Sequence, residues 1–159
     1  MSHGHFEEYA VIDTPGVYGI SSFNDEEKVA RDVILTADLI VNVVDAVHLE
    51  RDLFLSLQVI ETGNPTIIVL NMMDDAKREG LKIDLALLEE QLGVPVIPAV
   101  AIKGKGLKEL KEKLREARTG NIPLERQAQL KALTCRNYCR QSEALLILEG
   151  DEIVAKRIG

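Results

Sequence analysis

The chain has 159 residues, a net charge of −7, and 46% hydrophobic but only 4% aromatic residues. This length suits one domain or one domain with a small appendage, and its core must be built from Ile, Val and Leu. The acidic balance excludes a general electrostatic footprint for nucleic acid, and no apolar run approaches the ~20 residues that span a bilayer. Two cysteines and no apolar leader fit a reducing cytoplasm.

Strand-like and helix-like segments alternate along the chain. Loops rich in Gly, Pro, Ser and Asn separate them, and Asn24 with Glu27 has the spacing of a helix-capping box. The helix that follows is expected to bury Val29, Val33 and Ile34 on one face. The predicted elements are strands at Tyr9–Asp13, Leu39–Val44, Thr66–Leu70 and Val94–Pro98, and helices starting after Asn24 and at Leu49–Thr62, Asp84–Leu92 and Leu107–Ala117.

The strands are apolar along their whole length, which indicates burial on both faces. A parallel sheet sandwiched by helices has this property, so the pattern predicts an α/β fold. From Thr119 the strands stop, and Leu124–Gly159 predicts two or three helices. We therefore expect a domain over residues 1–118 and a small helical segment over residues 119–159, and we expect His3 and His5 to lie in a disordered tail.

Asp13 and Gly16 follow the first predicted strand, in the run Asp-Thr-Pro-Gly. A carboxylate at a strand end can hold Mg²⁺ through water, and a glycine lets a backbone N–H approach a phosphate oxygen. Ligands in parallel α/β folds bind beyond the carboxyl ends of the strands. The pair is therefore a candidate phosphate and Mg²⁺ site, although an ordinary strand-to-loop turn would carry the same residues.

Asn71 and Asp74 follow the third predicted strand with Asn-x-x-Asp spacing. A carboxylate with two acceptor oxygens can take both N–H groups of a guanine edge, which adenine lacks. We expect Asn71 to tie neighbouring loops together and touch the base; the alternative is an ordinary turn with Asp75 as a helix cap. Val100 and Ala101 follow the fourth strand, where a backbone N–H can serve the guanine oxygen.

With these motifs in order, the chain resembles the cytoplasmic G domain of the ferrous iron transport protein B family. The likeness covers about Tyr9 to Leu114, between the motifs as well as in them. It is carried by residues 11–18 (VIDTPGVY), 25–32 (DEEKVARD), 38–46 (DLIVNVVDA), 48–53 (HLERDL), 69–74 (VLNMMD), 92–96 (LGVPV) and 103–107 (KGKGL).

The resemblance implies a domain that binds GTP or GDP with Mg²⁺ and hydrolyses GTP slowly. In the full-length family it lies on the cytoplasmic side of the inner membrane, coupled through a helical domain to a membrane domain that carries Fe²⁺. By carry-over, Asp13 and Gly16 face Mg²⁺ and the γ-phosphate, Asn71 and Asp74 read guanine, and Val100 and Ala101 support the base.

One part of the family pattern is absent from this sequence, the Gly-x-x-x-x-Gly-Lys-Ser/Thr phosphate loop and its strand. That loop supplies the backbone cradle and the Lys for the phosphates, so we expect little GTP binding and no useful hydrolysis by this chain alone. The missing strand would lie between Tyr9–Asp13 and Leu39–Val44. We expect these two strands to pair directly, to self-associate through an open edge, or to lose order near the N-terminus.

Three readings of function stay open: an incomplete GTPase domain of an iron transporter, a pseudo-GTPase that regulates a partner, and half of a split GTPase completed by another chain. Cys135 and Cys139 are too few for a metal site and are interpreted as buried structural residues. The run Lys103–Lys113 alternates with Glu and is interpreted as an exposed face.

Overall fold

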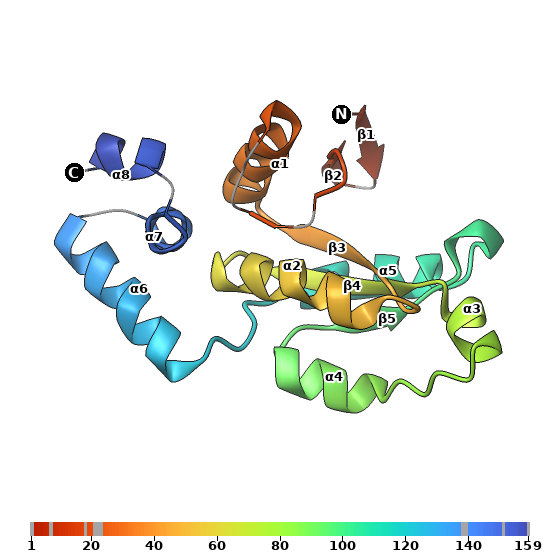
Figure 1. Cartoon of the computed structure of the whole chain (residues 1–159). Helices are drawn as coiled ribbons and strands as arrows, with labels where there is room; N and C mark the ends of the chain where they lie inside the picture. Colours follow the sequence, from red (N-terminus) through yellow and green to blue (C-terminus); the bar gives the residue numbers. More distant parts are fainter. Residues whose placement is uncertain are drawn as a thin grey trace.

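A computed structural model describes residues 2–6, 8–17, 19–20, 24–137, 140–150 and 152–158. Its elements alternate as the sequence predicts, and Figure 1 shows the helices arranged around a central sheet. In chain order they are β1 (Ser2–Phe6), β2 (Tyr9–Asp13), α1 (Asp25–Thr36), β3 (Ile40–Asp45), α2 (Leu49–Glu61), β4 (Thr66–Asn71), α3 (Met73–Arg78), α4 (Leu85–Leu92), β5 (Val96–Pro98), the 3-10 helix η1 (Ala101–Lys103), α5 (Leu107–Lys113), the 3-10 helix η2 (Leu114–Glu116), α6 (Leu124–Asn137), α7 (Gln141–Leu148) and α8 (Glu152–Ile158).

The central sheet has three parallel strands in the order β3-β4-β5. The middle strand, β4, is apolar on both faces because helices cover both. Ile68 and Leu70 pack in a cluster with residues of α2, α3 and α4, whereas Ile67 packs on the opposite side with Ile97 and Leu114. This arrangement confirms the predicted α/β class, a parallel sheet flanked by helices.

The N-terminal strands form a separate two-stranded sheet (Figure 1). β1 pairs antiparallel with β2, with Ser2 opposite Asp13 and Phe6 opposite Tyr9. Tyr9–Asp13 is a strand as predicted, but it is neither parallel nor buried, and only Tyr9 reaches the core. The prediction of a tail around His3 and His5 was also wrong. A hairpin needs only a short loop to close, so this local pairing is easier to form than one with a distant strand.

β3 is an edge strand of the central sheet, since it pairs with β4 alone among the described strands. Direct pairing of β2 with β3 was predicted as one outcome, and the structure contradicts it. Val43 of β3 is 62% exposed, whereas Asn42 is buried and donates a hydrogen bond of 2.6 Å to the Ser56 hydroxyl of α2. One face of β3 is therefore covered and the other is exposed. Self-association through the free backbone edge of β3 stays a prediction.

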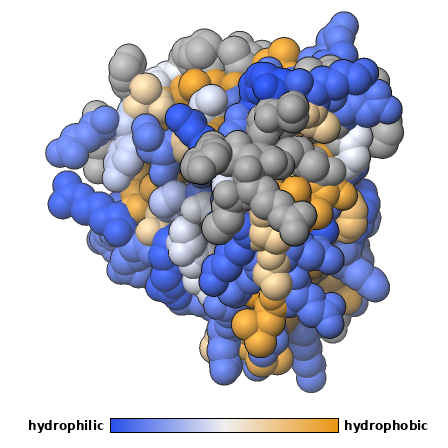
Figure 2. Space-filling model, turned by 90° about the vertical axis from the view of Figure 1, so that its left-hand side faces the viewer, coloured by the Kyte–Doolittle hydropathy of each residue, from blue (hydrophilic) through white to orange (hydrophobic). Residues whose placement is uncertain are grey.

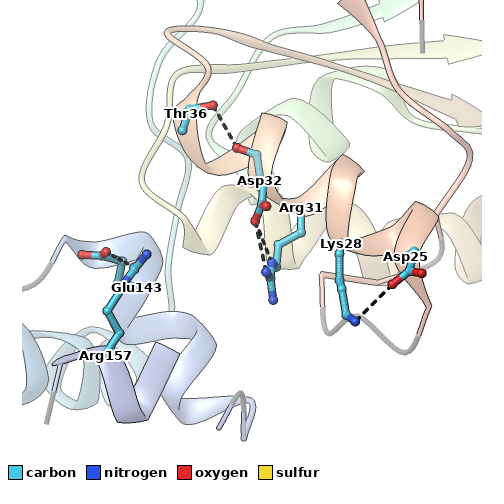
Figure 3. Close-up of polar contacts among 7 residues, drawn as sticks. All are labelled: Asp25, Lys28, Arg31, Asp32, Thr36, Glu143 and Arg157. Carbon is cyan, nitrogen blue, oxygen red and sulfur yellow. Dashed lines mark hydrogen bonds and ion pairs between the residues drawn. The ribbon is translucent and has the colours of Figure 1, made fainter. Parts of the chain in front are cut away.

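Helix α1 begins where the capping residues predict. The Asn24 side chain accepts a hydrogen bond of 2.8 Å from the Glu27 N–H. The helix buries Ala30, Arg31 and Ile34, while Val29 is exposed, so the predicted apolar face was only partly right. Arg31 reaches the Asp32 carboxylate, as Figure 3 shows, and this pairing lets a charged side chain lie at the buried face.

The C-terminal helices α6 and α7 pack on the sheet domain, and α8 contacts α7. Leu130, Ala144, Leu145 and Leu146 join a core cluster with residues of α1, β3 and α2. Arg126 of α6 pairs with Glu61 of α2 at 3.1 Å and with Glu149, and the Gln141 amide donates to the Glu61 carbonyl at 3.0 Å. The split at residue 118 into two domains stays a prediction.

Surface features agree with a helix-covered domain. Figure 2 views the left-hand side of Figure 1 and shows mostly hydrophilic residues with hydrophobic ones between them. Arg157 of α8 pairs with Glu143 of α7 (Figure 3). No helix in the part of the chain that the structure describes is long and apolar enough to cross a membrane.

The helix predicted over Leu107–Ala117 ends earlier, at Lys113, and continues as η2.

Candidate functional site

Asn71, the last residue of β4, ties together two loops at the carboxyl edge of the sheet. Its side-chain oxygen accepts a hydrogen bond of 2.9 Å from the backbone N–H of Ala101, which follows β5. A second bond, 3.2 Å from the Met73 N–H to the Ala99 carbonyl, joins the same loops. The loop tie predicted for Asn71 is thus present, but it occupies the Ala101 N–H that was expected to serve a guanine oxygen.

Met72 holds an uncommon backbone conformation between Asn71 and α3. Its φ of 61° is the one positive value for a non-glycine residue in the described chain. This left-handed residue turns the chain so that α3 begins at Met73. Asp75 therefore lies inside the first turn and forms an ion pair with Arg78, and it is not the helix cap that the alternative interpretation required.

The Asp74 carboxylate projects toward the loop after β5. Its Oδ2 atom lies 2.5 Å from Lys103 Nζ, and its Oδ1 atom accepts a hydrogen bond of 3.1 Å from the Asp75 N–H. The hydrogen bond from Lys103 lowers the pKa of Asp74 below its ordinary value. Asp74 is therefore ionised near neutral pH, which suits an acceptor of two N–H donors.

The loop that carries Lys103 is fixed by its own backbone. Val100 and Lys105 exchange two backbone hydrogen bonds of 3.2 Å, and the turn between them is η1. Gly106 has φ +88°, and a Cβ at this position would lie 2.6 Å from the Pro98 carbonyl oxygen. Only glycine fits there without movement of the backbone, so the position of the loop is defined by close packing on β5.

These residues line one cleft of about 640 Å³. Its walls include the Asn71 and Asp74 side chains and the exposed apolar residues Met72 and Ile102, of which Ile102 is 94% exposed. The complete lining is Asn71, Met72, Asp74, Asp75, Arg78, Val100, Ile102 and Lys103. The structure therefore brings together two predicted side chains, Asn71 and Asp74, with the predicted loop residue Val100.

A second cleft of about 410 Å³ lies next to the first, sharing Met72, Asp75 and Arg78 with it. It contains Asp45, at the end of β3, and His48, whose Nδ1 lies 2.8 Å from the Asp45 carboxylate. Partial burial raises the pKa of Asp45, but hydrogen bonds from His48 and from the Val47 N–H outweigh it, so the net pKa is lowered.

Asp13 and Gly16 are not part of the first cleft. Asp13 is exposed at the end of β2, and Gly16 lines a different hollow of about 270 Å³ with Asn42, Val43 and other residues. A Cβ at Gly16 would meet no atom within 4 Å. The two halves of the predicted site are thus separate, because β2 pairs with β1 in another sheet and not with β3.

Sequence reasoning missed Lys103 and Met72. Lys103 was interpreted as part of an exposed face, and its side chain is indeed 56% exposed, yet it pairs with Asp74. The signal that could have found it is its position in the loop after β5, since loops after neighbouring parallel strands meet at one edge. Cys139 and the Cys135 side chain lie outside the described residues.

The donor set for a metal is small. Within residues 2–158, apart from those left undescribed, no group of three or more His, Cys, Asp or Glu side chains could hold a metal ion. Mg²⁺ is commonly held by one or two carboxylates together with substrate phosphates and water. The exposed Asp13 carboxylate fits that role only when a nucleotide supplies the remaining oxygens.

A parallel α/β sheet with Asn-x-x-Asp after one strand and a backbone-tied loop after the next is the arrangement of a G domain. Residues 1–114 match the family model described as "Ferrous iron transport protein B". The chain therefore belongs to the ferrous iron transport protein B (FeoB) family.

Solved structures and curated relatives agree. The mGMPPNP-bound NFeoB of S. thermophilus aligns with 99% of this chain and 66% of its own, at 34% identity and a TM-score of 0.84. The GDP-form cytosolic domain of the T. maritima FeoB iron transporter aligns with 98% of this chain and 68% of its own, at 30% identity and a TM-score of 0.81. The Fe(2+) transporter FeoB of Salmonella typhimurium is 39% identical over 129 residues, which are 77% of this chain and 17% of that relative.

The chain thus spans less than a fifth of the curated relatives it matches and about two thirds of the solved cytosolic chains.

Proposed function

We propose that this chain recognises the guanine base of GDP and GTP through Asn71 and Asp74, as the G-domain portion of a transporter that takes up Fe²⁺. The observation that carries the proposal is the single cleft that both side chains line with the loop after β5. An ionised Asp74 matches the N1–H and 2-amino donors of guanine and mismatches adenine. The exposed Met72 and Ile102 side chains offer apolar surface for a flat base.

The phosphate side of the nucleotide is weakly provided for. The sequence contains no Gly-x-x-x-x-Gly-Lys-Ser/Thr loop, and Asp13 and Gly16 lie away from the base cleft. We infer that base contacts supply most of the affinity that this chain has, so binding is weak and hydrolysis is negligible. Mg²⁺ bound to the nucleotide would meet Asp13 through water, where it would neutralise phosphate charge.

A split GTPase is the second candidate, and the free edge of β3 favours it. An edge strand presents unpaired backbone groups that a further strand can use, and Val43 is exposed there. A strand from another segment or chain that ended in the phosphate loop would lie between β2 and β3. A pseudo-GTPase, which keeps the fold and regulates a partner, is the remaining alternative.

The test is a titration of the purified chain with fluorescent GDP and GTP in Mg²⁺, beside the Asp74→Asn variant. We expect weak, saturable binding that the variant loses, and a gain of binding to xanthosine diphosphate, because an Asn amide can donate to the 2-oxo group of xanthine.

Each other result selects an alternative. Micromolar or tighter binding that Asp74→Asn abolishes would mean that another segment of this chain supplies the phosphate cradle, and it would contradict the weak binding inferred above. Absence of binding up to millimolar nucleotide would contradict guanine recognition and support a pseudo-GTPase. Equal binding of guanine and adenine nucleotides would exclude Asp74 as the reader of the base.

A further inference from the structure

We propose that Lys103 is an internal competitor for the guanine site: its ammonium group occupies the Asp74 carboxylate, and a guanine base binds only by displacing it. This inference rests on the proposed function and adds to it a residue that sets the affinity. The contact is direct, with 2.5 Å between Lys103 Nζ and Asp74 Oδ2, and both residues line the base cleft.

Both oxygens of Asp74 are already engaged inside the protein. Oδ2 accepts from Lys103, and Oδ1 accepts from the Asp75 N–H at 3.1 Å. Guanine presents two parallel donors, which require both carboxylate oxygens from one side. The Asp75 N–H belongs to the backbone of α3 and is fixed there, whereas the Lys103 ammonium is carried by a flexible side chain of the loop after β5 and lines the cleft with Asp74.

The loop geometry places Lys103 there. Lys103 is the last residue of η1, and its N–H donates to the Val100 carbonyl at 2.9 Å. Asn71 holds the Ala101 N–H two residues before Lys103, and Lys105 two residues after it pairs with the Val100 backbone, so the loop is held on both sides of Lys103. The side-chain oxygen of the second predicted reader, Asn71, is therefore also engaged by this loop.

Charge near Asp74 comes from few groups. Arg78 of α3 also lies near enough to interact with it, but its guanidinium pairs with Asp75. Lys105 is two residues further along the loop and exposed, and its backbone, paired with Val100, keeps it in the same turn. Lys105 is thus a matched lysine whose removal changes the net charge equally without touching the Asp74 contact.

The pair is solvent-accessible, with 56% of the Lys103 and 32% of the Asp74 side chain exposed. Exposed pairs of this kind are weak, so displacement by a ligand is feasible. Removing Lys103 should tighten guanine binding by about 2- to 5-fold, the range that the coupling of exposed ion pairs corresponds to.

The experiment compares the 159-residue chain with its Lys103→Met and Lys105→Met variants. GMP and AMP are titrated into each protein, and dissociation constants are taken from NMR chemical-shift changes. GMP probes the base with one phosphate, so it does not depend on the missing phosphate loop. We expect Lys103→Met to bind GMP more tightly than the wild type, Lys105→Met to bind it equally or more weakly, and AMP to show no such difference.

A parallel measurement follows the Asp74 carboxyl signal as pH is changed. In Lys103→Met the pKa of Asp74 should rise toward its ordinary value, and in Lys105→Met it should stay low. An unchanged pKa in Lys103→Met would show that the contact is absent in solution and would overturn the inference.

The failures are distinguishable. GMP binding that is equal or weaker in Lys103→Met overturns the competition while leaving guanine recognition intact. GMP binding to none of the three proteins overturns both this inference and the proposed function.

Discussion

The two halves of the proposed nucleotide site, the base-reading end at Asn71 and Asp74 and the phosphate-facing end at Asp13 and Gly16, differ in how they are held. At the first, β4 and β5 are adjacent, and Asn71, Asp74 and the Val100–Gly106 loop are joined by several hydrogen bonds. At the second, β2 lies in a different sheet from β3, and Asp13 and Gly16 lie apart from the base cleft. A site shared between strands is complete only where the strands are neighbours.

The largest expected effect is the difference in stability lost on substituting a residue of the covered strand β4 and a residue of the exposed face of β3. Ile68→Ala removes a fully buried side chain from β4, so we expect the free energy of unfolding to fall by about 2–5 kcal/mol. Val43→Ala on the open face of β3 should change it by no more than about 0.5 kcal/mol. Urea unfolding followed by circular dichroism measures both, and a comparable loss in the two variants would show that β3 is covered in solution.

A pair of glycine substitutions sharpens the contrast between the two loops. Gly106→Ala places a Cβ against the Pro98 carbonyl at positive φ, so a loss of more than about 1 kcal/mol is expected. Gly16→Ala meets open space, so stability should stay within about 0.5 kcal/mol of the wild type. Thermal unfolding of both variants is the measurement; a strongly destabilised Gly16→Ala would mean that the phosphate-facing loop is packed.

The smallest effect concerns acid stability at Asp45, where β3 meets the base-reading end. In the folded protein the pKa of Asp45 lies below its ordinary value of 3.8. At a pH between the folded pKa and 3.8, the unfolded chain therefore binds more protons than the folded one. The stabilisation is present above pH ~5 and lost as pH falls through the folded pKa. Asp45→Asn should therefore flatten the dependence of urea midpoints between pH 5 and pH 3. An unchanged slope would place the acid sensitivity elsewhere.

Much of the fold could be predicted from the sequence, because the signals are local. The run Thr66–Leu70 has four consecutive apolar residues after Thr66, and it forms the central strand. Asn24 and Asp84 cap helices by contacts with residues three positions later. Asn71 and Asp74 could be placed together from the sequence because the motif lies within four consecutive residues, and they do line one cleft.

What could not be predicted depends on partners distant in sequence. The apolar run Tyr9–Asp13 has the composition of a buried strand, but it pairs with β1 outside the central sheet and is mostly exposed. The Lys103 contact with Asp74 joins residues 29 apart through two separate loops, and no periodicity reports such a meeting.

The bond from the Gln141 amide to the Glu61 carbonyl also bears on the order in which the chain folds. It satisfies a carbonyl at the end of α2 from a residue 80 positions later. Contacts of such long sequence separation form only after a large loop has closed. We therefore expect this carbonyl at the end of α2 to gain its side-chain partner only after α7 has docked, whereas the backbone bonds of the same turn, from Thr62 to Val59 and from Gly63 to Ile60, close locally.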